Sequence, residues 1–263
     1  MKKLYRIARA LVLLALLSPL GLAWLPPDRL PLRLEPAFQA VLQSSFRQLS
    51  ITLAATLALA ALLTVVLGYA SVLWQRFGRT GASILKAVES VPAILVALFC
   101  YAPVSGYLAR HSSGASQTVS LLVFILAATL TLLPEAVRGV AIPLGDLYHR
   151  KYSLSFRSYG FTKRRILAVL MGSHVMRGTL KRIAAGILLK TLVLDCSFGF
   201  IIQLGFGSYG TPAHASPGAL IAANRDALFE GGTPALFWLP SLLLVAISTS
   251  FLLTLGEREE AAA

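Results

Sequence analysis

The sequence has few charged residues, few acids and almost no cysteine. Charged residues make up 13% of the 263 residues and hydrophobic residues 56%, whereas soluble domains carry about 25% charged residues. This composition predicts a polytopic membrane protein with little room for a separate soluble domain. The two cysteines, Cys100 and Cys196, both lie in apolar runs. That setting favours two small hydrophobic side chains over a disulfide or a metal-binding pair.

Motifs for nucleotide hydrolysis and metal catalysis are also absent. No lysine follows a glycine, so a P-loop cannot occur, and an ATP-driven role would need an ATPase on another subunit. None of the four histidines lies in an H-E-x-x-H motif. We therefore expect no catalytic, cofactor or metal site. Ser208, in a Gly-Ser-Tyr-Gly run close to His214, leaves an intramembrane hydrolase as a remote alternative, although a turn is the simpler interpretation.

Basic residues outnumber acidic residues by 24 to 11, which gives a formal net charge of +13. They lie between hydrophobic runs, so we interpret them as orientation signals near anionic headgroups and not as nucleic-acid contacts. Six apolar spans are predicted, the first as an uncleaved helix, although a signal peptide would look similar. Basic residues divide 18 to 5 between the two sides, which predicts that both termini are cytoplasmic. The predicted spans are 1–25, 49–74, 87–101, 118–133, 183–202 and 235–255.

The longest polar stretch, residues 134–182, holds ten of the basic residues, which predicts a cytoplasmic location. Three aromatic residues within it are spaced i, i+4 and i+7: Tyr152, Phe156 and Tyr159. This spacing predicts one face of a short helix, which Gly160 ends and after which Thr162 caps the next helix. Such a helix either presses on a soluble partner or rests on anionic lipid.

Two ionisable residues, Lys190 and Asp195, lie inside the fifth predicted span. Ionisable groups at membrane depth are costly unless they face a polar cavity or a partner. Their i, i+5 spacing does not place them on one helix face, so we expect each to face another helix or the other half of an oligomer. In the long outer segment that follows, residues 218–229 are predicted to form a short helix.

With these motifs the chain resembles the membrane permease subunits of ATP-binding-cassette importers. Among these it is similar to the second permease of the dipeptide, oligopeptide and nickel class. The best match is RKYSLSFRSYG at 150–160, where Tyr152, Arg157 and Gly160 fit the family's run of a basic residue, Tyr, Glu-Ala-Ala and a later Gly. Here Leu154-Ser155-Phe156 stands in place of Glu-Ala-Ala. Residues 195–226 resemble the family's Ser-Phe-Leu-Gly-x-Gly run and outer loop, and residues 89–92 give a weaker match.

The resemblance implies an all-α polytopic fold of six transmembrane helices, the type I importer permease fold. It implies an N-terminal helix and outer segment over 1–48 and a permease core over 49–263, with the coupling segment at 134–182. Together with the patterns above, the resemblance gives three groups of expected functional residues: Tyr152, Phe156, Arg157, Tyr159 and Gly160 in the helix that couples to an ATPase; Lys190 and Asp195 at the pathway or subunit interface; and Gly218, Asn224, Arg225 and Asp226 in the loop that docks a binding protein.

The resemblance also implies partners and a location. The partners are a second homologous permease, two ATPase subunits, an extracytoplasmic solute-binding protein and membrane lipid. The location is the bacterial inner membrane, with both termini cytoplasmic. Peptide is the expected cargo, and nickel or a metal-chelator complex is the alternative. A structural subunit of some other membrane complex also stays open.

Overall fold

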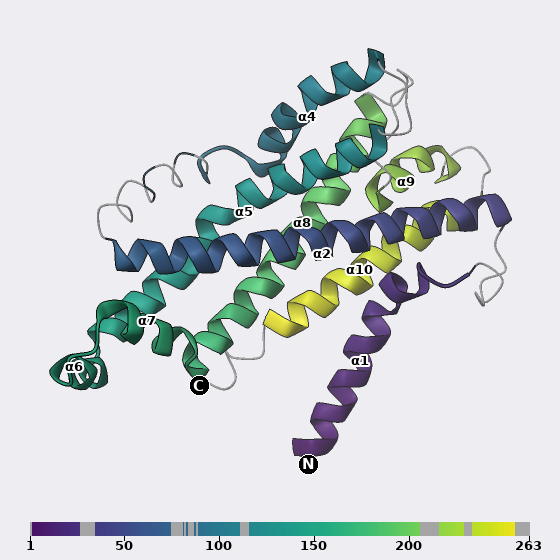
Figure 1. Ribbon diagram of the computed structural model, residues 1–263. Coiled ribbons are helices and arrows are strands. Elements are labelled where there is room, and N and C mark those ends of the chain that lie inside the picture. The colour runs from purple at the N-terminus through teal and green to yellow at the C-terminus, as the bar shows by residue number, and fades with distance from the viewer. Residues whose placement is uncertain are drawn as a thin grey trace.

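The computed structural model describes residues 2–26, 35–74, 89–110, 116–205, 216–228 and 233–255, together with residues 81, 83 and 87. All the secondary structure in these ranges is helical (Figure 1). The elements are α1 (Lys2–Leu22), α2 (Pro36–Leu73), α4 (Ala93–Arg110), α5 (Ser116–His149), α6 (Lys151–Ser158), α7 (Lys163–Met171), α8 (His174–Gly205), α9 (Pro217–Ala223), η3 (Arg225–Leu228) and α10 (Ala235–Leu255).

Four helices of the described chain are long and apolar enough to cross a membrane: Pro36–Leu73, Thr118–His149, His174–Ile202 and Ala235–Thr254. They form the body of the molecule, with α5 and α8 beside α2 and with α10 against α8 (Figure 1). α1 supplies a shorter apolar helix, Leu11–Leu22, and its N-terminal end diverges from the others (Figure 1). The chain is therefore an all-α membrane protein, and the count of six spans stays a prediction.

α2 is longer than the predicted span because the preceding amphipathic stretch joins it. Phe38, Leu42, Phe46 and Leu49 recur every three or four residues and are all buried, so one face of the helix continues from its first turn into the apolar run. Pro36 occupies one of the first two helical positions, where its missing N–H costs little. At 38 residues the helix is about 57 Å long. It passes without a break through position 49, where the sequence had suggested a boundary.

α5 and α4 also run further than the sequence indicated. α5 continues through Pro134 and Pro143 to His149, so the first third of the predicted polar stretch 134–182 is helical. Prolines are tolerated in membrane helices because neighbouring groups satisfy the freed carbonyls. α4 begins at Ala93 and reaches Arg110, so the helix continues past position 101, where the third predicted span ended. α10 has the bounds that were predicted for the last span.

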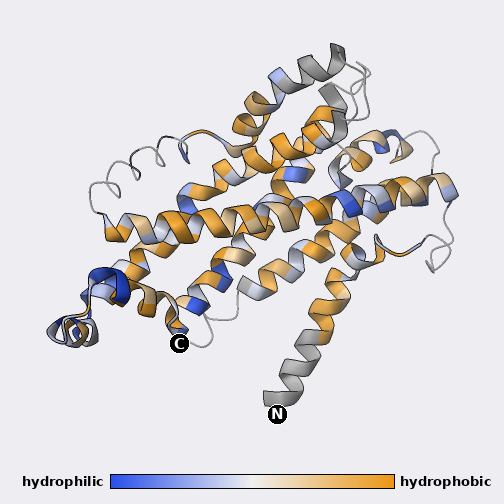
Figure 2. Cartoon of the chain, in the orientation of Figure 1, coloured by the Kyte–Doolittle hydropathy of each residue, from blue (hydrophilic) through white to orange (hydrophobic). Residues whose placement is uncertain are grey.

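Short helices lie at the two ends of the bundle. α6 and α7 lie at one end and α9 lies at the other (Figure 1). Hydropathy follows this arrangement, since the long helices are mainly apolar and polar residues concentrate near α6 and α7 (Figure 2). We call the α6–α7 end the basic end, because Lys163, Arg164 and Arg165 begin α7 there.

Candidate functional site

The first candidate site is the corner at the basic end where α5 turns into α6. Arg157 of α6 donates from Nη2 to the carbonyl oxygen of Tyr148, near the end of α5, at 2.8 Å. Its guanidinium also lies 4.0 Å from the centre of the Tyr148 ring, an arrangement that favours a cation. Ser153 is fully buried on the same side of α6. These contacts fix α6 against the end of α5.

The turn that ends α6 is a Schellman motif, and Gly160 makes it possible. The Gly160 N–H donates to the Arg157 carbonyl oxygen at 2.9 Å, and the Phe161 N–H donates to the Phe156 carbonyl oxygen at 3.1 Å. Gly160 has a φ of 77°, the one positive φ in the described part of the chain. This confirms the left-handed conformation that the sequence predicted there. Phe156 and Phe161, the two residues that make the apolar contact of this motif, have ring centres 5.8 Å apart.

α6 therefore has an inner and an outer face. Ser153, Phe156 and Arg157 turn inward, and Phe156 packs on a cluster of buried side chains from α5, α7 and the start of α8. Four exposed residues recur at the helical spacing of three and four on the opposite face: Lys151, Leu154, Ser155 and Ser158. Tyr159 follows the helix and is 80% exposed. The face that α6 presents is a small amphipathic surface with Leu154 at its centre.

This arrangement differs from the sequence interpretation, which put Phe156 and Tyr159 on one partner-facing side. The helix ends at Ser158, so the i+7 spacing no longer applies at Tyr159. Phe156 is drawn inward by Phe161, across the turn. Arg157 contacts Tyr148 and lies on the inner face of α6. The Tyr152 side chain lies outside the described residues.

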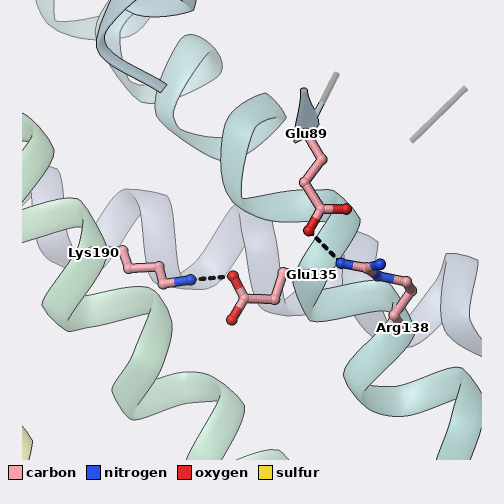
Figure 3. A network of polar contacts seen from close by, with 4 residues as sticks. All are labelled: Glu89, Glu135, Arg138 and Lys190. Carbon is pink, nitrogen blue, oxygen red and sulfur yellow. Dashed lines mark hydrogen bonds and ion pairs between the residues drawn. The ribbon is translucent and has the colours of Figure 1, made fainter. Parts of the chain in front are cut away.

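The second candidate site is a pair of ion pairs among membrane-spanning helices (Figure 3). Lys190 of α8 pairs with Glu135 of α5, and Arg138 of α5 pairs with Glu89, which precedes α4. Glu135 and Arg138 are one turn apart on α5, so this helix presents one charge to each neighbour (Figure 3). Lys190 thus faces another helix, as expected. The sequence had placed Glu135 in a loop, and its role here was missed.

The Glu135–Lys190 ion pair borders hollows on the surface of the chain. A hollow of about 430 Å³ lies between the start of α4, α5 and α8, and one of about 340 Å³ continues along α5 and α8. Glu135 and Lys190 border both hollows, and their side chains are 62% and 49% exposed. Charges this exposed in the middle of apolar spans require water or a partner beside them. Asp195, one turn or so further along α8, is by contrast buried at 1% exposure.

The predicted docking loop forms the third candidate site, at the other end of the bundle. Ser216 accepts a hydrogen bond from the Ala219 N–H and so caps α9. Gly218 is buried where α9 crosses α8, since a Cβ there would overlap the Cys196 carbonyl. Asn224 donates back to the Leu220 carbonyl oxygen. Of the four predicted docking residues, Arg225 and Asp226 are exposed, and they pair with each other. Gly218 and Asn224 therefore shape the loop, and the two charged residues form its surface.

Some sequence predictions fall on residues that the structure does not describe. These include the Gly-Ser-Tyr-Gly run at 207–210 with His214, and the last residue of the helix predicted over 218–229.

A comparison with family models finds no match. The chain is similar to proteins named "Putative peptide transport system permease protein" from Brucella suis, Brucella abortus and Brucella melitensis. Each similarity is 28% identity over 183 residues, which cover 68% of this chain. The matched stretch spans 54% of each relative, so the similarity extends over about half of those proteins.

Proposed function

We propose that this chain is a membrane permease subunit of an ATP-driven importer. In this proposal it forms half of a translocation path together with a second, homologous permease. Two ATPase subunits bind at the basic end, and a solute-binding protein delivers cargo at the α9 end. The spans would rock between inward-open and outward-open states as rigid bodies. Peptide is the cargo we propose, in line with the names of the similar Brucella proteins.

The observation that carries the proposal is the way α6 is held. A lipid-resting helix needs only an apolar face and can move independently of the spans. α6 instead has its apolar Phe156 and its cation Arg157 turned inward onto α5 and α7. It exposes a surface with a single large aliphatic side chain, Leu154, which is 52% exposed. A helix fixed to the end of a span can transmit a push to that span, which is what coupling to an ATPase requires.

The hollows beside Glu135 and Lys190 support the second half of the proposal. A translocation path needs a polar surface at membrane depth, and an ion pair that borders two adjoining hollows provides one. We propose that this side of α5 and α8 faces the path or the second permease. Six spans, the type I importer fold, an inner-membrane location and cytoplasmic termini belong to the same proposal.

Co-purification tests the proposed assembly. The chain, carrying a C-terminal tag and expressed with its neighbouring genes, should bring down a second apolar polytopic subunit and an ATPase at fixed stoichiometry. A Leu154→Glu variant should keep the second permease and lose the ATPase, since the charge lies only on the exposed face of α6. A chain that purifies alone, in a form that is stable and active in isolation, would contradict the importer assignment.

Thiol labelling tests the proposed orientation. In a background without Cys100 and Cys196, single cysteines at Ser158 and at Asp226 lie at the two ends of the bundle. A membrane-impermeant reagent added to intact cells should label the second position and not the first. Labelling of the Ser158→Cys variant from outside would show the opposite topology and exclude ATPase docking at α6.

A further inference from the structure

An apolar groove lies between the end of α2 and the outer side of α7, at the basic end. We call it the α2–α7 groove, and its volume is about 510 Å³, within the range of about 300–1,000 Å³ typical of small-molecule sites. Its lining residues are Val65, Val66, Tyr69, Ala70, Leu73, Trp74, Ala168 and Met171. Val66 and Trp74 are 53% and 54% exposed, so the groove is open. Neither the coupling surface nor the ion-pair hollows use it.

The walls of this groove are fixed to each other. The Tyr69 hydroxyl donates to the Arg164 carbonyl oxygen at 2.9 Å. The Lys163 ammonium donates to the Leu73 carbonyl oxygen at 3.1 Å, which is one of the carbonyls left free at the end of α2. Each hydrogen bond joins α2 to the first turn of α7. The groove is thus a formed feature of the fold and binding there would need little reorganisation.

One end of the groove is cationic. Arg164, Ala168 and Met171 are spaced i, i+4 and i+7, so they share one face of α7, and the latter two line the groove. The exposed Arg164 therefore lies at its mouth, one turn before Ala168. Val65 and Val66 lie two turns before the end of α2 and form the opposite, deeper end within the apolar span.

The first turn of α7 favours an anion at this mouth. It begins with three consecutive cations, Lys163, Arg164 and Arg165, and the Thr162 side chain at the N-cap makes no capping hydrogen bond to the helix. Cations at a helix N-terminus oppose the helix dipole, which an anion relieves. Trp74 stands at the end of α2, and tryptophan at a span end is typical of the membrane interface. The α2–α7 groove runs from interfacial cations into an apolar span, and so it matches the anionic headgroup and the acyl chain of a phospholipid.

From this arrangement we infer that the α2–α7 groove is a binding site for one anionic phospholipid. The headgroup phosphate contacts Arg164 beside Trp74, and an acyl chain lies along Val66 and Ala168. Basic pockets between membrane helices are known to hold anionic headgroups. The site requires only that the chain is a membrane protein, and so it stands whether or not the importer proposal holds. Its occupant joins the end of α2 to the segment that bears α6.

Fluorescence quenching tests the site, because Trp74 borders it. Replacing Trp24 and Trp238 by Phe leaves Trp74 as the single tryptophan of the chain. The full chain, with any subunits that accompany it, is placed in nanodiscs with brominated-acyl phosphatidylglycerol or brominated-acyl phosphatidylcholine. Brominated phosphatidylglycerol should quench Trp74 fluorescence at a lower lipid content than brominated phosphatidylcholine does. Arg164→Gln should weaken this preference about fivefold, the effect expected for one basic residue near the surface.

Matched variants separate the groove from general lipid contact. Ala168→Phe fills the groove and should remove the saturable quenching, whereas Val169→Phe, at an exposed neighbouring position outside the groove lining, should retain it. Arg177→Gln, which removes an exposed cation near the start of α8, is the control for Arg164→Gln. Soluble glycerol phosphate should not displace the lipid, since the acyl chain contributes to binding.

Three results would overturn the inference. Equal quenching by the two lipids, unchanged in Arg164→Gln, would mean ordinary surrounding lipid. Displacement by glycerol phosphate would mean an anion site without an acyl-chain site. Protection of Trp74 from both lipids once other subunits are bound would mean that a protein covers the groove.

Discussion

Gly160 gives the sharpest test of how α6 is held. Its φ of 77° lies in the left-handed region, where a residue with a Cβ incurs a cost of about 1–2 kcal/mol. A Cβ built on Gly160 has no neighbouring atom within 4 Å. Substitution therefore changes the backbone preference without a clash, and the effect can be read as conformational cost alone.

The magnitude follows from that cost. A penalty of about 1–2 kcal/mol changes the ratio of formed to unformed turn by a factor of about 5–30. Asparagine tolerates the left-handed region better than other residues with a Cβ, and β-branched residues tolerate it least. Coupling should therefore fall in the order Gly160, Gly160→Asn, Gly160→Ala and Gly160→Val. The two Schellman hydrogen bonds and the Phe156–Phe161 contact should weaken in the same order.

The assay measures the turn and its consequence separately. Hydrogen exchange at the Gly160 and Phe161 amides reports the turn, and in the proposed importer cargo-stimulated ATP hydrolysis reports coupling. Retention of the second permease is the control and should stay constant, since the turn lies outside the spans. A Gly160→Val variant with wild-type exchange and coupling would refute the reasoning. So would an asparagine variant as damaged as the valine variant, because side-chain bulk and not backbone conformation would then be responsible.

Three further predictions concern the other contacts. Leu154→Ala should weaken ATPase binding and leave the melting temperature unchanged. Phe156→Ala should weaken ATPase binding and also destabilise the basic end by about 2 kcal/mol, measured by thermal unfolding. The same outcome for both variants would contradict the assignment of an inner and an outer face to α6. Lys190→Met should lower stability or transport, and adding Glu135→Gln should recover part of the loss. The coupling free energy in this double-mutant cycle should be on the order of 0.6 kcal/mol, which is typical of polar contacts between membrane helices. Strictly additive effects would count against the Lys190–Glu135 ion pair. Gly218→Ala should lower the free energy of unfolding by about 1–3 kcal/mol, because α9 must move off the Cys196 carbonyl. Gly186→Ala in α8, where the added Cβ meets open space, is the control and should be neutral or slightly stabilising. Equal melting temperatures for the two variants would show that the α8–α9 contact can relax.

The sequence predicted best where one local property decides the structure. α10 has the predicted bounds because a largely apolar run without charged residues lies between Pro234 and the charged residues that follow position 255. Gly160 was predicted to end a helix because glycine adopts positive φ without strain, and the structure has that conformation. Neither prediction needed information about which other helices lie nearby.

It predicted less well where a helix continues through a residue that normally stops one. The fourth span was predicted to end at 133, just before Pro134, so Glu135 was assigned to a polar loop. In α5 the helix continues, and Glu135 lies inside it, opposite Lys190. A lysine within a predicted span requires a counter-charge or water, and that requirement was the available signal: an acidic residue next to a span end was the natural partner to examine.

The orientation of α6 shows why spacing alone did not identify the partner-facing side. Periodicity groups Phe156 with the aromatic residues on either side of it, but it gives no information about which face the rest of the chain covers. Here Phe161 lies beyond the turn and contacts Phe156 through the Schellman geometry. The carbonyl oxygen of Tyr148 accepts a hydrogen bond from Arg157, and the Tyr148 ring makes a cation–π contact with the Arg157 guanidinium. Phe156 and Arg157, which looked most suited to binding a partner, therefore hold α6 against α5 and α7. Leu154, at the position where the resembling family has glutamate, is left to face outward. An ATPase that binds this chain should therefore present an apolar contact there, in place of a cation that would pair with glutamate.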